Sequence, residues 1–403
     1  MQNLYLGVDI GSVSINIVAV DEDNRLVFKL YTRNSGSPID LVKEGLKDFK
    51  DEVDLANYEI SGVGVTGSGR QLIAYVLGAD TVKNEITAHA RASTYYYPDA
   101  GTIFEIGGQD SKLIIVEDGI AVDFAMNTVC AAGTGSFLDH QAERLGIQIE
   151  EFGSLALEAE RDVRIAGRCT VFAESDMISK QQYGFTKPEI IKGLSEALVR
   201  NYMNNLVRNR VLEGKFIFQG GVAANIGIKS AFEEEIEAEV IVPEHHDVMG
   251  AIGIAMLAKR DIKRSGEKTN FRGFDLTEEK FETISFECED CANNCEVIKV
   301  IADGRVIAVT GDRCGKWAAS LITAQNPAAA DMKESSQKQE AEAEEETNLY
   351  KVDPEKEKQV MRELEELELE DEKKEEEKAA EEAEIAQKSE AADSDEKDDN
   401  VYV

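Results

Sequence analysis

Residues 4–21 have the sequence LYLGVDIGSVSINIVAVD, in which two β-branched apolar runs flank the turn GSVS. This pattern predicts an antiparallel hairpin. It returns 96 residues later, where Asp9-Ile10-Gly11 aligns with Glu105-Ile106-Gly107. Two unrelated hairpins would also produce so short a match. The equal spacing of acid, turn and second strand nevertheless favours two duplicated domains that face each other across a cleft.

Short apolar strands alternate with longer helical stretches along the body of the chain, which predicts an α/β fold. Helices are expected at residues 40–53 and 189–211 and from Gly250 onward. A second hairpin is expected at 102–118, and two further strands are expected at 58–66 and 215–222. We expect three regions. The α/β region covers residues 1–265, with subdomains at about 1–98 and 99–265. A Cys-rich segment at 280–317 and a tail at 318–403 follow it.

The net charge of −35 excludes several functions. Residues 331–403 contain 29 acids and 11 bases, so about half of the charge belongs to the tail. A chain this acidic is a poor ligand for nucleic acid and is repelled by anionic membranes. No run approaches the ~18 apolar residues of a membrane span, and the start MQNLYLGVDIGS lacks the basic region of a signal peptide. We expect a cytoplasmic protein.

The tail is polar and low in complexity from about Ala318. Val360, Leu364 and Leu367 have coiled-coil spacing, but the next seam positions are charged. One partial heptad cannot sustain a coiled coil. We therefore expect a solvated tail that is disordered or partly helical.

The two hairpin turns have the composition of phosphate-binding loops, because glycine lets backbone N–H groups approach phosphate oxygens. The first turn, residues 11–14, adds two hydroxyl groups. Asp9 precedes it and would hold Mg²⁺ through water or orient the attacking water. The second turn, residues 107–110, offers the same groups from the opposite side, with Asp110 as a second acid near the metal.

A third Gly-rich element, GGVAAN at residues 220–225, ends a strand and opens a helix, where a base or ribose can lie against the backbone. The order hairpin, hairpin, strand-GG-helix resembles the actin, sugar kinase and Hsp70 ATPase superfamily. This resemblance implies two ribonuclease H-like domains around an ATP cleft, and residues 250–258 resemble the closing helix of that fold. No P-loop sequence GxxxxGK[ST] occurs.

Cys130 and Cys169 each precede a helical pattern. Helix N-termini carry unpaired N–H groups and a partial positive charge, which stabilises thiolates and the clusters that thiolates bind. Two cysteines are half of a four-thiolate site. They are either two free core cysteines or half of a cluster on a twofold axis between identical chains.

The segment from Leu4 to about Ala258 resembles the activator family of 2-hydroxyacyl-CoA dehydratases, whose relatives include ATPase subunits of benzoyl-CoA reductase. The matching strings are GVDIGS, GVTGSGR, NEITAHARAS, FEIGGQDSK, NTVCAAGTGSFLD, CTVFAESD, and QGGVAANIG followed by VPEHHDVMGAIG. The pair formed by CAAGTGSFLD and CTVFAES is the most specific part of the match.

The resemblance implies a homodimer with one [4Fe-4S] cluster at the subunit interface, bound by Cys130 and Cys169 of each chain. It also implies that binding and hydrolysis of ATP change the angle between the helices carrying the cluster. The reduced activator then passes one electron at very low potential to a partner acyl-CoA dehydratase or reductase. A ferredoxin- or flavodoxin-like protein would supply that electron.

Residues and resemblance together give a candidate nucleotide site. The expected catalytic residues are Asp9, Gln109 and Asp110. The expected ATP- and Mg²⁺-binding positions are Gly11, Ser12, Val13, Ser14, Ile15, Asn16, Gly107, Gly108, Gly220, Gly221, Ala223, Asn225 and Asp247.

The family's phosphate turn usually ends in Lys where this chain has Asn16, so either another group substitutes for that cation or hydrolysis is slower. His89 matches the family string NEITAHARAS, but we expect it to be structural.

A second set of cysteines, Cys288, Cys291, Cys295 and Cys314, lies outside the family core. One tight trio and one distant cysteine are typical of a metal site. A closed Cys₄ zinc site and a second [4Fe-4S] cluster both fit this spacing. The surrounding sequence predicts a small β-rich knuckle with ADGR as a hairpin turn.

Two other functions compete with an ATP-dependent electron-transfer activator. One is a small-molecule kinase of the same superfamily, in which Asp9 and Asp110 would serve phosphoryl transfer. That function leaves the paired cysteines without a role. The other is a regulatory protein in which the nucleotide clamp gates partner binding through the tail.

Overall fold

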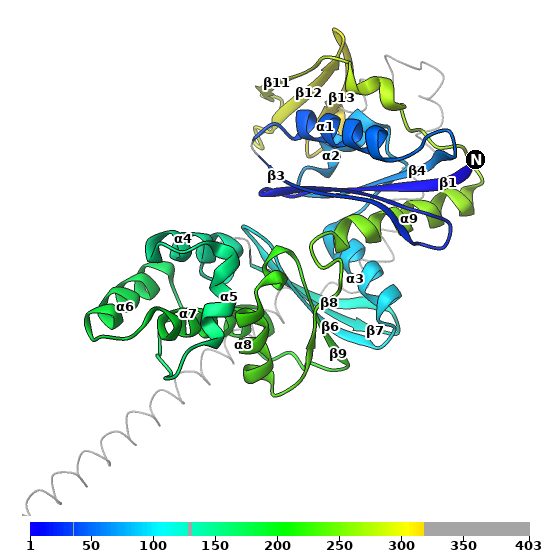
Figure 1. The fold of residues 1–403 in the computed structure, drawn as a ribbon. Coiled ribbons are helices and arrows are strands. Elements are labelled where there is room, and N and C mark those ends of the chain that lie inside the picture. The colour runs from blue at the N-terminus through cyan, green and yellow to red at the C-terminus, as the bar shows by residue number, and fades with distance from the viewer. Residues whose placement is uncertain (35, 128–130, 318–403) are drawn as a thin grey trace, which may run out of the picture. The chain divides into compact units, whose positions relative to one another are not determined.

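Two five-stranded sheets form the body of the protein, as Figure 1 shows for the computed structural model, which describes residues 1–34, 36–127 and 131–317. The strand order is β3-β2-β1-β4-β5 in the first sheet and β8-β7-β6-β9-β10 in the second. The first contains β1 (Gln2–Ile10), β2 (Ser14–Val20), β3 (Leu26–Arg33), β4 (Tyr58–Gly67) and β5 (Thr81–Val82). The second contains β6 (Ala100–Ile106), β7 (Ser111–Glu117), β8 (Ile120–Asn127), β9 (Lys215–Gln219) and β10 (Val240–Ile241).

The two sheets share one topology, and the predicted duplication explains it. In each sheet the first three strands are antiparallel and the last two continue in parallel. The hairpin turns match as well: Gly11 N donates to Ser14 O at 2.9 Å, and Gly107 N donates to Asp110 O at 3.0 Å. These pairs are 96 residues apart in sequence, the same shift that aligns the hairpins. The predicted α/β class and both hairpins are confirmed.

Helices cover both faces of the first sheet, because alternate residues of β1 point to opposite sides. Leu4, Leu6 and Val8 pack in one core with α1 and α2, whereas Tyr5 packs in another with α9. Figure 1 shows α1 and α2 on one side of this sheet and α9 on the other. These helices are α1 (Pro38–Glu52), α2 (Arg70–Leu77) and α9 (Met249–Ser265).

The second sheet is covered in the same way. Its larger core joins Phe104 on β6 with Tyr202 and Phe232, whose rings lie 5.7 and 4.7 Å from the Phe104 ring. Ile103 faces the opposite side and packs with Ile86 of α3. The helices on this half of the chain are α3 (Glu85–Tyr96), α4 (Gly135–Leu145), α5 (Ile149–Leu157), α6 (Thr170–Gln182), α7 (Lys187–Tyr202) and α8 (Ile226–Ile236). None of the helices in the described ranges combines the length and apolar character of a membrane span.

The long helix expected at 189–211 is shorter than predicted. Helix α7 ends at Tyr202 and continues only as a π-helical turn, Met203–Val207. Arg208 closes this turn at φ 49°, with its N–H donating to Met203 O at 3.0 Å. A positive φ cannot continue a right-handed helix, so the chain turns there toward β9.

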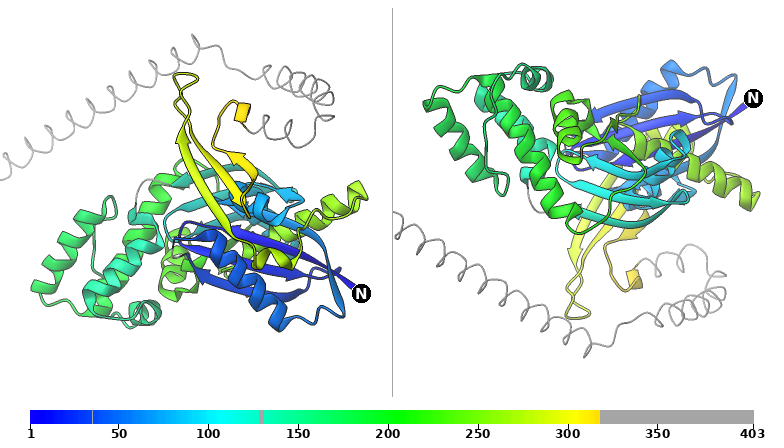
Figure 2. Two further views of the ribbon diagram at one scale, coloured as in Figure 1. Left: turned by 90° about the horizontal axis from the view of Figure 1, so that it is seen from above. Right: turned by 90° about the horizontal axis from the view of Figure 1, so that it is seen from below.

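A third sheet follows the family-like region and consists of β11 (Phe281–Glu287), β12 (Glu296–Ala302) and β13 (Arg305–Thr310). Figure 2 shows β11 and β12 as a long hairpin. Val300 and Ala308 join the core of the first sheet, so this sheet is not a separate unit. Asp303 and Gly304 form the β12–β13 turn with φ of 45° and 77°, a geometry for which Asp-Gly is a preferred sequence. The tail lies outside the described residues, and the subdomain boundaries near residue 98 stay a prediction.

Helix α9 lies against the first sheet and α3 at unusually close range. A side chain at Gly7 would meet the backbone of Ala251, and one at Gly253 would meet the carbonyl of Ala88. The predicted closing helix therefore packs through backbone atoms, which only glycine permits at these two points.

We expect Gly253→Ala to destabilise the protein by about 1–3 kcal/mol, because the new methyl group must displace the backbone of α3. Urea unfolding measures the effect. Arg264→Ala, on the exposed end of the same helix, is the control and should change stability by less than about 0.5 kcal/mol. Equal stabilities of wild type and Gly253→Ala would show that α9 does not pack this closely.

Candidate functional site

The three Gly-rich elements converge on one pocket of about 120 Å³. The first hairpin turn, the second hairpin turn and the end of β9 each contribute backbone to its wall. Predicted site residues that line it are Asp9, Gly11, Ser12, Val13, Ser14, Asn16, Gly107, Gly108, Asp110, Gly220, Gly221 and Asp247. Segments more than 200 residues apart in sequence thus meet where the resemblance places a nucleotide.

Glycine is required at two of these contacts. A side chain at Gly108 would collide with Val13 of the opposite turn, so the two hairpin turns touch. Gly220 has φ 91°, and a side chain there would meet the carbonyl of Ile106. The three backbones therefore come together at the pocket, where glycine lets a ligand approach the main chain closely.

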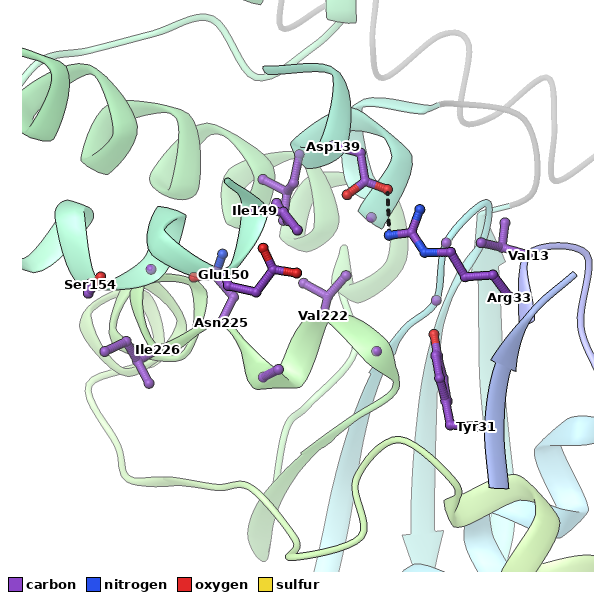
Figure 3. A pocket seen from close by; sticks show the side chains of 17 residues that line it. Val13, Tyr31, Arg33, Asp139, Ile149, Glu150, Ser154, Val222, Asn225 and Ile226 are labelled. Carbon is purple, nitrogen blue, oxygen red and sulfur yellow. Dashed lines mark ion pairs between the residues drawn. The ribbon is translucent and has the colours of Figure 1, made fainter. Parts of the chain in front are cut away.

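A second pocket of about 340 Å³ adjoins the first and shares Val13, Tyr31, Gly107, Gly108 and Gly221 with it (Figure 3). Its wall includes apolar side chains, among them Leu138, Ile149, Val222 and Ile226. Figure 3 shows Arg33 of β3 pointing toward Asp139 of α4, with an ion pair at 3.8 Å. A polar pocket that opens into a larger, partly apolar one matches a ligand with phosphates at one end and a base at the other.

Four predicted positions lie differently from the rest. Asn225 lines the second pocket and caps α8, accepting hydrogen bonds from Gly227 N and Ile228 N at 3.0 and 3.1 Å. Ile15 and Ala223 are buried in the cores, and Gln109 is exposed; none of these three lines either pocket. Asp247, by contrast, lines the first pocket and pairs with Lys29 at 2.7 Å.

A buried charge cluster fills the floor of the first pocket. Lys112 is only 2% exposed, and its Nζ lies 2.8 Å from Glu85, 2.9 Å from Glu105 and 2.9 Å from Asp110. Burial alone would lower the pKa of Lys112, but the three carboxylates outweigh it and hold that pKa well above its ordinary value. Lys112 is therefore a permanent cation.

Two carboxyl groups at this site, those of Asp9 and Glu105, have pKa values close to neutral pH. The pKa of Asp9 is raised to about 7, chiefly by burial and also by the charges of Glu85 and Asp110, while Lys112 opposes the rise. Burial likewise raises the pKa of Glu105 to about 7, with Lys112 again opposing. Carboxyl groups with a pKa in this range can gain or lose a proton at working pH, which is typical of functional sites.

Three members of this cluster stand at positions that sequence patterns mark, but no pattern indicates that they lie together. Glu105 is the repeat partner of Asp9, and Lys112 lies 96 residues after Asn16. Glu85 belongs to the string NEITAHARAS, where Asn84 caps α3 by accepting from Thr87 N at 2.9 Å. Only the folded chain shows that these three side chains meet.

His89 is satisfied by structural contacts. Its Nδ1 accepts a hydrogen bond from Gln219 Nε2 at 2.9 Å, and Gln219 Oε1 accepts from Ser93 Oγ at 2.8 Å. The pKa of His89 is lowered to about 3, chiefly by burial and also by the charge of Lys112, while Glu85 opposes the change. The ring is thus neutral and acts as a hydrogen-bond acceptor.

The first pair of predicted metal-binding cysteines is described only in part. Cys169 is the N-cap residue of α6, is partly exposed, and precedes the exposed side chains of Val171 and Phe172. Cys130 lies outside the described residues. The position of Cys169 at a helix N-terminus fits a thiolate ligand to an iron-sulfur cluster.

The second set of cysteines lies at one end of the third sheet. Cys288 N donates to Cys295 O at 2.8 Å, and the indole N–H of Trp317 donates to Cys288 Sγ at 3.3 Å. Lys316 pairs with Asp290 at 2.7 Å beside them. In residues 1–34, 36–127 and 131–317, no three His, Cys, Asp or Glu side chains form a group that could hold a metal ion. The metal site at these cysteines stays a prediction from spacing.

We expect His89→Gln to flatten the pH dependence of stability. The pKa of His89 is below its unfolded value of 6.5, so its contribution is complete above pH 6.5 and is lost as the pH falls toward 3. Removing it should lower the slope of unfolding free energy against pH by up to about 1.4 kcal/mol per pH unit in that window.

Asp9 and Glu105 act in the opposite sense, since their raised pKa values favour folding at low pH and lose effect as the pH rises through about 7. Comparison of variant and wild type at equal pH cancels their effect. His140→Gln, at an exposed position on α4, is the control. An unchanged slope in His89→Gln would contradict a buried neutral imidazole.

Comparisons with known proteins agree with this geometry. The model of the BadF/BadG/BcrA/BcrD ATPase family matches residues 6–258. The 2-hydroxyisocaproyl-CoA dehydratase activator of Clostridioides difficile is 34% identical over 261 residues, which cover 64% of this chain and 96% of the activator. The (R)-2-hydroxyglutaryl-CoA dehydratase activating ATPase of Acidaminococcus fermentans is 32% identical over 63% of this chain and 96% of that protein.

Solved structures show the same likeness. The structure of the activator of 2-hydroxyisocaproyl-CoA dehydratase from Clostridium difficile with bound ADPNP covers 65% of this chain and 97% of its own, at 31% identity and a TM-score of 0.59. The likeness confirms the predicted fold class, and the family model spans more than half of the chain. This protein therefore belongs to the BadF/BadG/BcrA/BcrD ATPase family.

Proposed function

We propose that this chain is an ATP-dependent activator that passes one electron to a partner 2-hydroxyacyl-CoA dehydratase or related reductase. One observation carries the proposal: two equivalent Gly-rich turns touch across a pocket with a buried charge cluster, in a chain whose Cys169 starts a helix. Relatives named as activators of such dehydratases support it.

The pocket suits a nucleotide phosphate chain for three reasons. Its rim is built from glycine backbone, Ser12 and Ser14 supply hydroxyl groups, and Lys112 supplies a cation. Mg²⁺ in nucleotide sites commonly takes one or two carboxylates plus phosphate oxygens and water, and Asp9 and Asp110, which both line the pocket, would serve that role. Asp9, when deprotonated, can accept a proton from an attacking water.

Nucleotide contacts would couple the two halves of the body. Val13 belongs to the first hairpin and Gly108 to the second, so a ligand held by both turns bridges the two sheets. Loss of the terminal phosphate removes contacts that both turns share, which changes the preferred angle between them. We propose that this change is transmitted to α4 and α6, the helices that follow Cys130 and Cys169.

Cys130 and Cys169 of two copies would together hold one [4Fe-4S] cluster in a homodimer. Such a cluster, when bound, supplies one-electron transfer at low potential. The chain's own contribution is the thiol of Cys169 at the positive end of α6 and the exposed apolar residues Val171 and Phe172 beside it. An exposed apolar patch next to this thiol fits burial against a second copy. A ferredoxin- or flavodoxin-like protein would supply the electron.

We expect the protein purified without oxygen to be a dimer with about four irons from the first site, and with more if the second cysteine set also binds a cluster. Cys169→Ser should lose this iron and electron transfer to the dehydratase, while binding of ATP persists because Cys169 lines neither nucleotide pocket. Iron analysis, EPR and calorimetric ATP titration test these outcomes. Ser175→Ala, on the same helix, is the control and should keep its iron. A colourless wild type, or ATP turnover that depends on a sugar substrate, would overturn the proposal.

We also propose that Cys288, Cys291, Cys295 and Cys314 bind Zn²⁺ or a second cluster, which their spacing and common location at one end of the third sheet support. Trp317 is the only tryptophan of the chain, and its indole contacts Cys288. Removal of metal should therefore change tryptophan fluorescence, and Cys288→Ser should abolish both the change and the bound metal. Cys169→Ser is the control, because it should leave this second metal in place. Wild-type protein without metal beyond the first cluster would exclude the site.

A further inference from the structure

The duplicated hairpins differ at one position that matters for phosphate binding. Asp9 pairs with Asn16 in the first hairpin, and Glu105 pairs with Lys112 at the same register in the second. Both positions are seven residues after the acid and line the same pocket. The cation that the first turn lacks is thus present at the equivalent place in the second.

Lys112 is the one lysine or arginine among the described residues that line this pocket. The same wall carries five acids, Asp9, Glu85, Glu105, Asp110 and Asp247. A phosphate chain entering it would meet net negative charge unless cations compensate. Lys112, with a flexible four-carbon stem, is the group of this chain that can do so.

A second, independent observation favours a ligand in this pocket. Asn16 is 6% exposed, and within the described part of the chain its Oδ1 has no hydrogen-bond partner. A buried amide oxygen without a donor is costly. A metal-bound water or a protonated ligand group in the pocket would satisfy it, and no neighbouring side chain in the described residues does.

We infer that Lys112 is the phosphate-binding cation of this pocket, and that the ligand-free chain holds it among Glu85, Glu105 and Asp110. This inference rests on the proposed ATP site. Bound Mg²⁺ would supply positive charge beside these carboxylates, and Lys112 Nζ would then be free to turn to the terminal phosphate. One cation thereby replaces another, and the acids are never left buried without a counter-charge.

The exchange would also link nucleotide state to the position of α3. Glu85 lies at the start of α3, which packs against α9 on one side and against the second sheet on the other. The pair between Glu85 and Lys112, at 2.8 Å, ties this helix to the second hairpin. Transfer of Lys112 to a phosphate breaks that tie, so the hairpin and α3 can move relative to each other only when nucleotide is bound.

Calorimetric titration of the full-length dimer with ADP and with a non-hydrolysable ATP analogue, with and without Mg²⁺, tests the inference. Lys112→Gln should weaken binding of the ATP analogue by roughly 10- to 100-fold and that of ADP by less, because the lost contact is a charge-assisted one to the terminal phosphate. Adding Asn16→Lys to Lys112→Gln returns a cation to the equivalent position and should restore most of the affinity. Lys192→Gln, which breaks a 2.6 Å ion pair with Asp162, is the control and should bind normally.

A second variant covers the case in which Lys112→Gln does not fold. Glu85→Gln keeps Lys112 but removes one of its partners, so the ATP analogue should bind more tightly. Unchanged affinity in Glu85→Gln, or a folded Lys112→Gln that binds the ATP analogue like wild type, would show that Lys112 is only a structural counter-ion. Failure of the wild type itself to bind the ATP analogue would instead overturn the proposed function.

Discussion

A single buried ammonium group pairs with three of the five acids that line the candidate site. Lys112 Nζ lies within 2.9 Å of carboxylates from α3, β6 and the second hairpin turn. Acids this close can be buried together only if a cation or protons compensate them, because the protein interior screens charge poorly. The chain uses both means, since the pKa of Asp9 and that of Glu105 are raised to about 7. The elements that carry these groups must therefore meet at one point.

The duplication explains why both sheets contribute residues to this site. Each half repeats the same strand order and the same Gly turn, so two equivalent Gly-rich turns face each other. The copies are not identical in chemistry. The first hairpin carries Asp9 and Asn16, and the second carries Glu105 and Lys112. The first copy thus places an acid and an amide at the positions where the second copy has an acid and a cation.

Much of the fold followed from local patterns. The hairpins, the strand at β9 and the closing helix were predictable because apolar periodicity and turn glycines report on the chain's immediate neighbours. The end of α7 was not predictable. The helical apolar pattern continues beyond Tyr202, whereas the chain leaves the helix because Arg208 adopts a positive φ. Ile15, Ala223 and Gln109 were expected at the site because motifs do not show on which side of the backbone a side chain points.

The sequence by itself determined the α/β class, the repeat and its turns, the acids beside them and the family, all of which depend on short-range spacing. Tertiary structure alone decided that Glu85 and Lys112 meet, and that α9 lies close enough to the first sheet to require Gly7 and Gly253. The physical reason is that ion pairing and close packing depend on distances between segments far apart in the chain. No local pattern of residues encodes those distances.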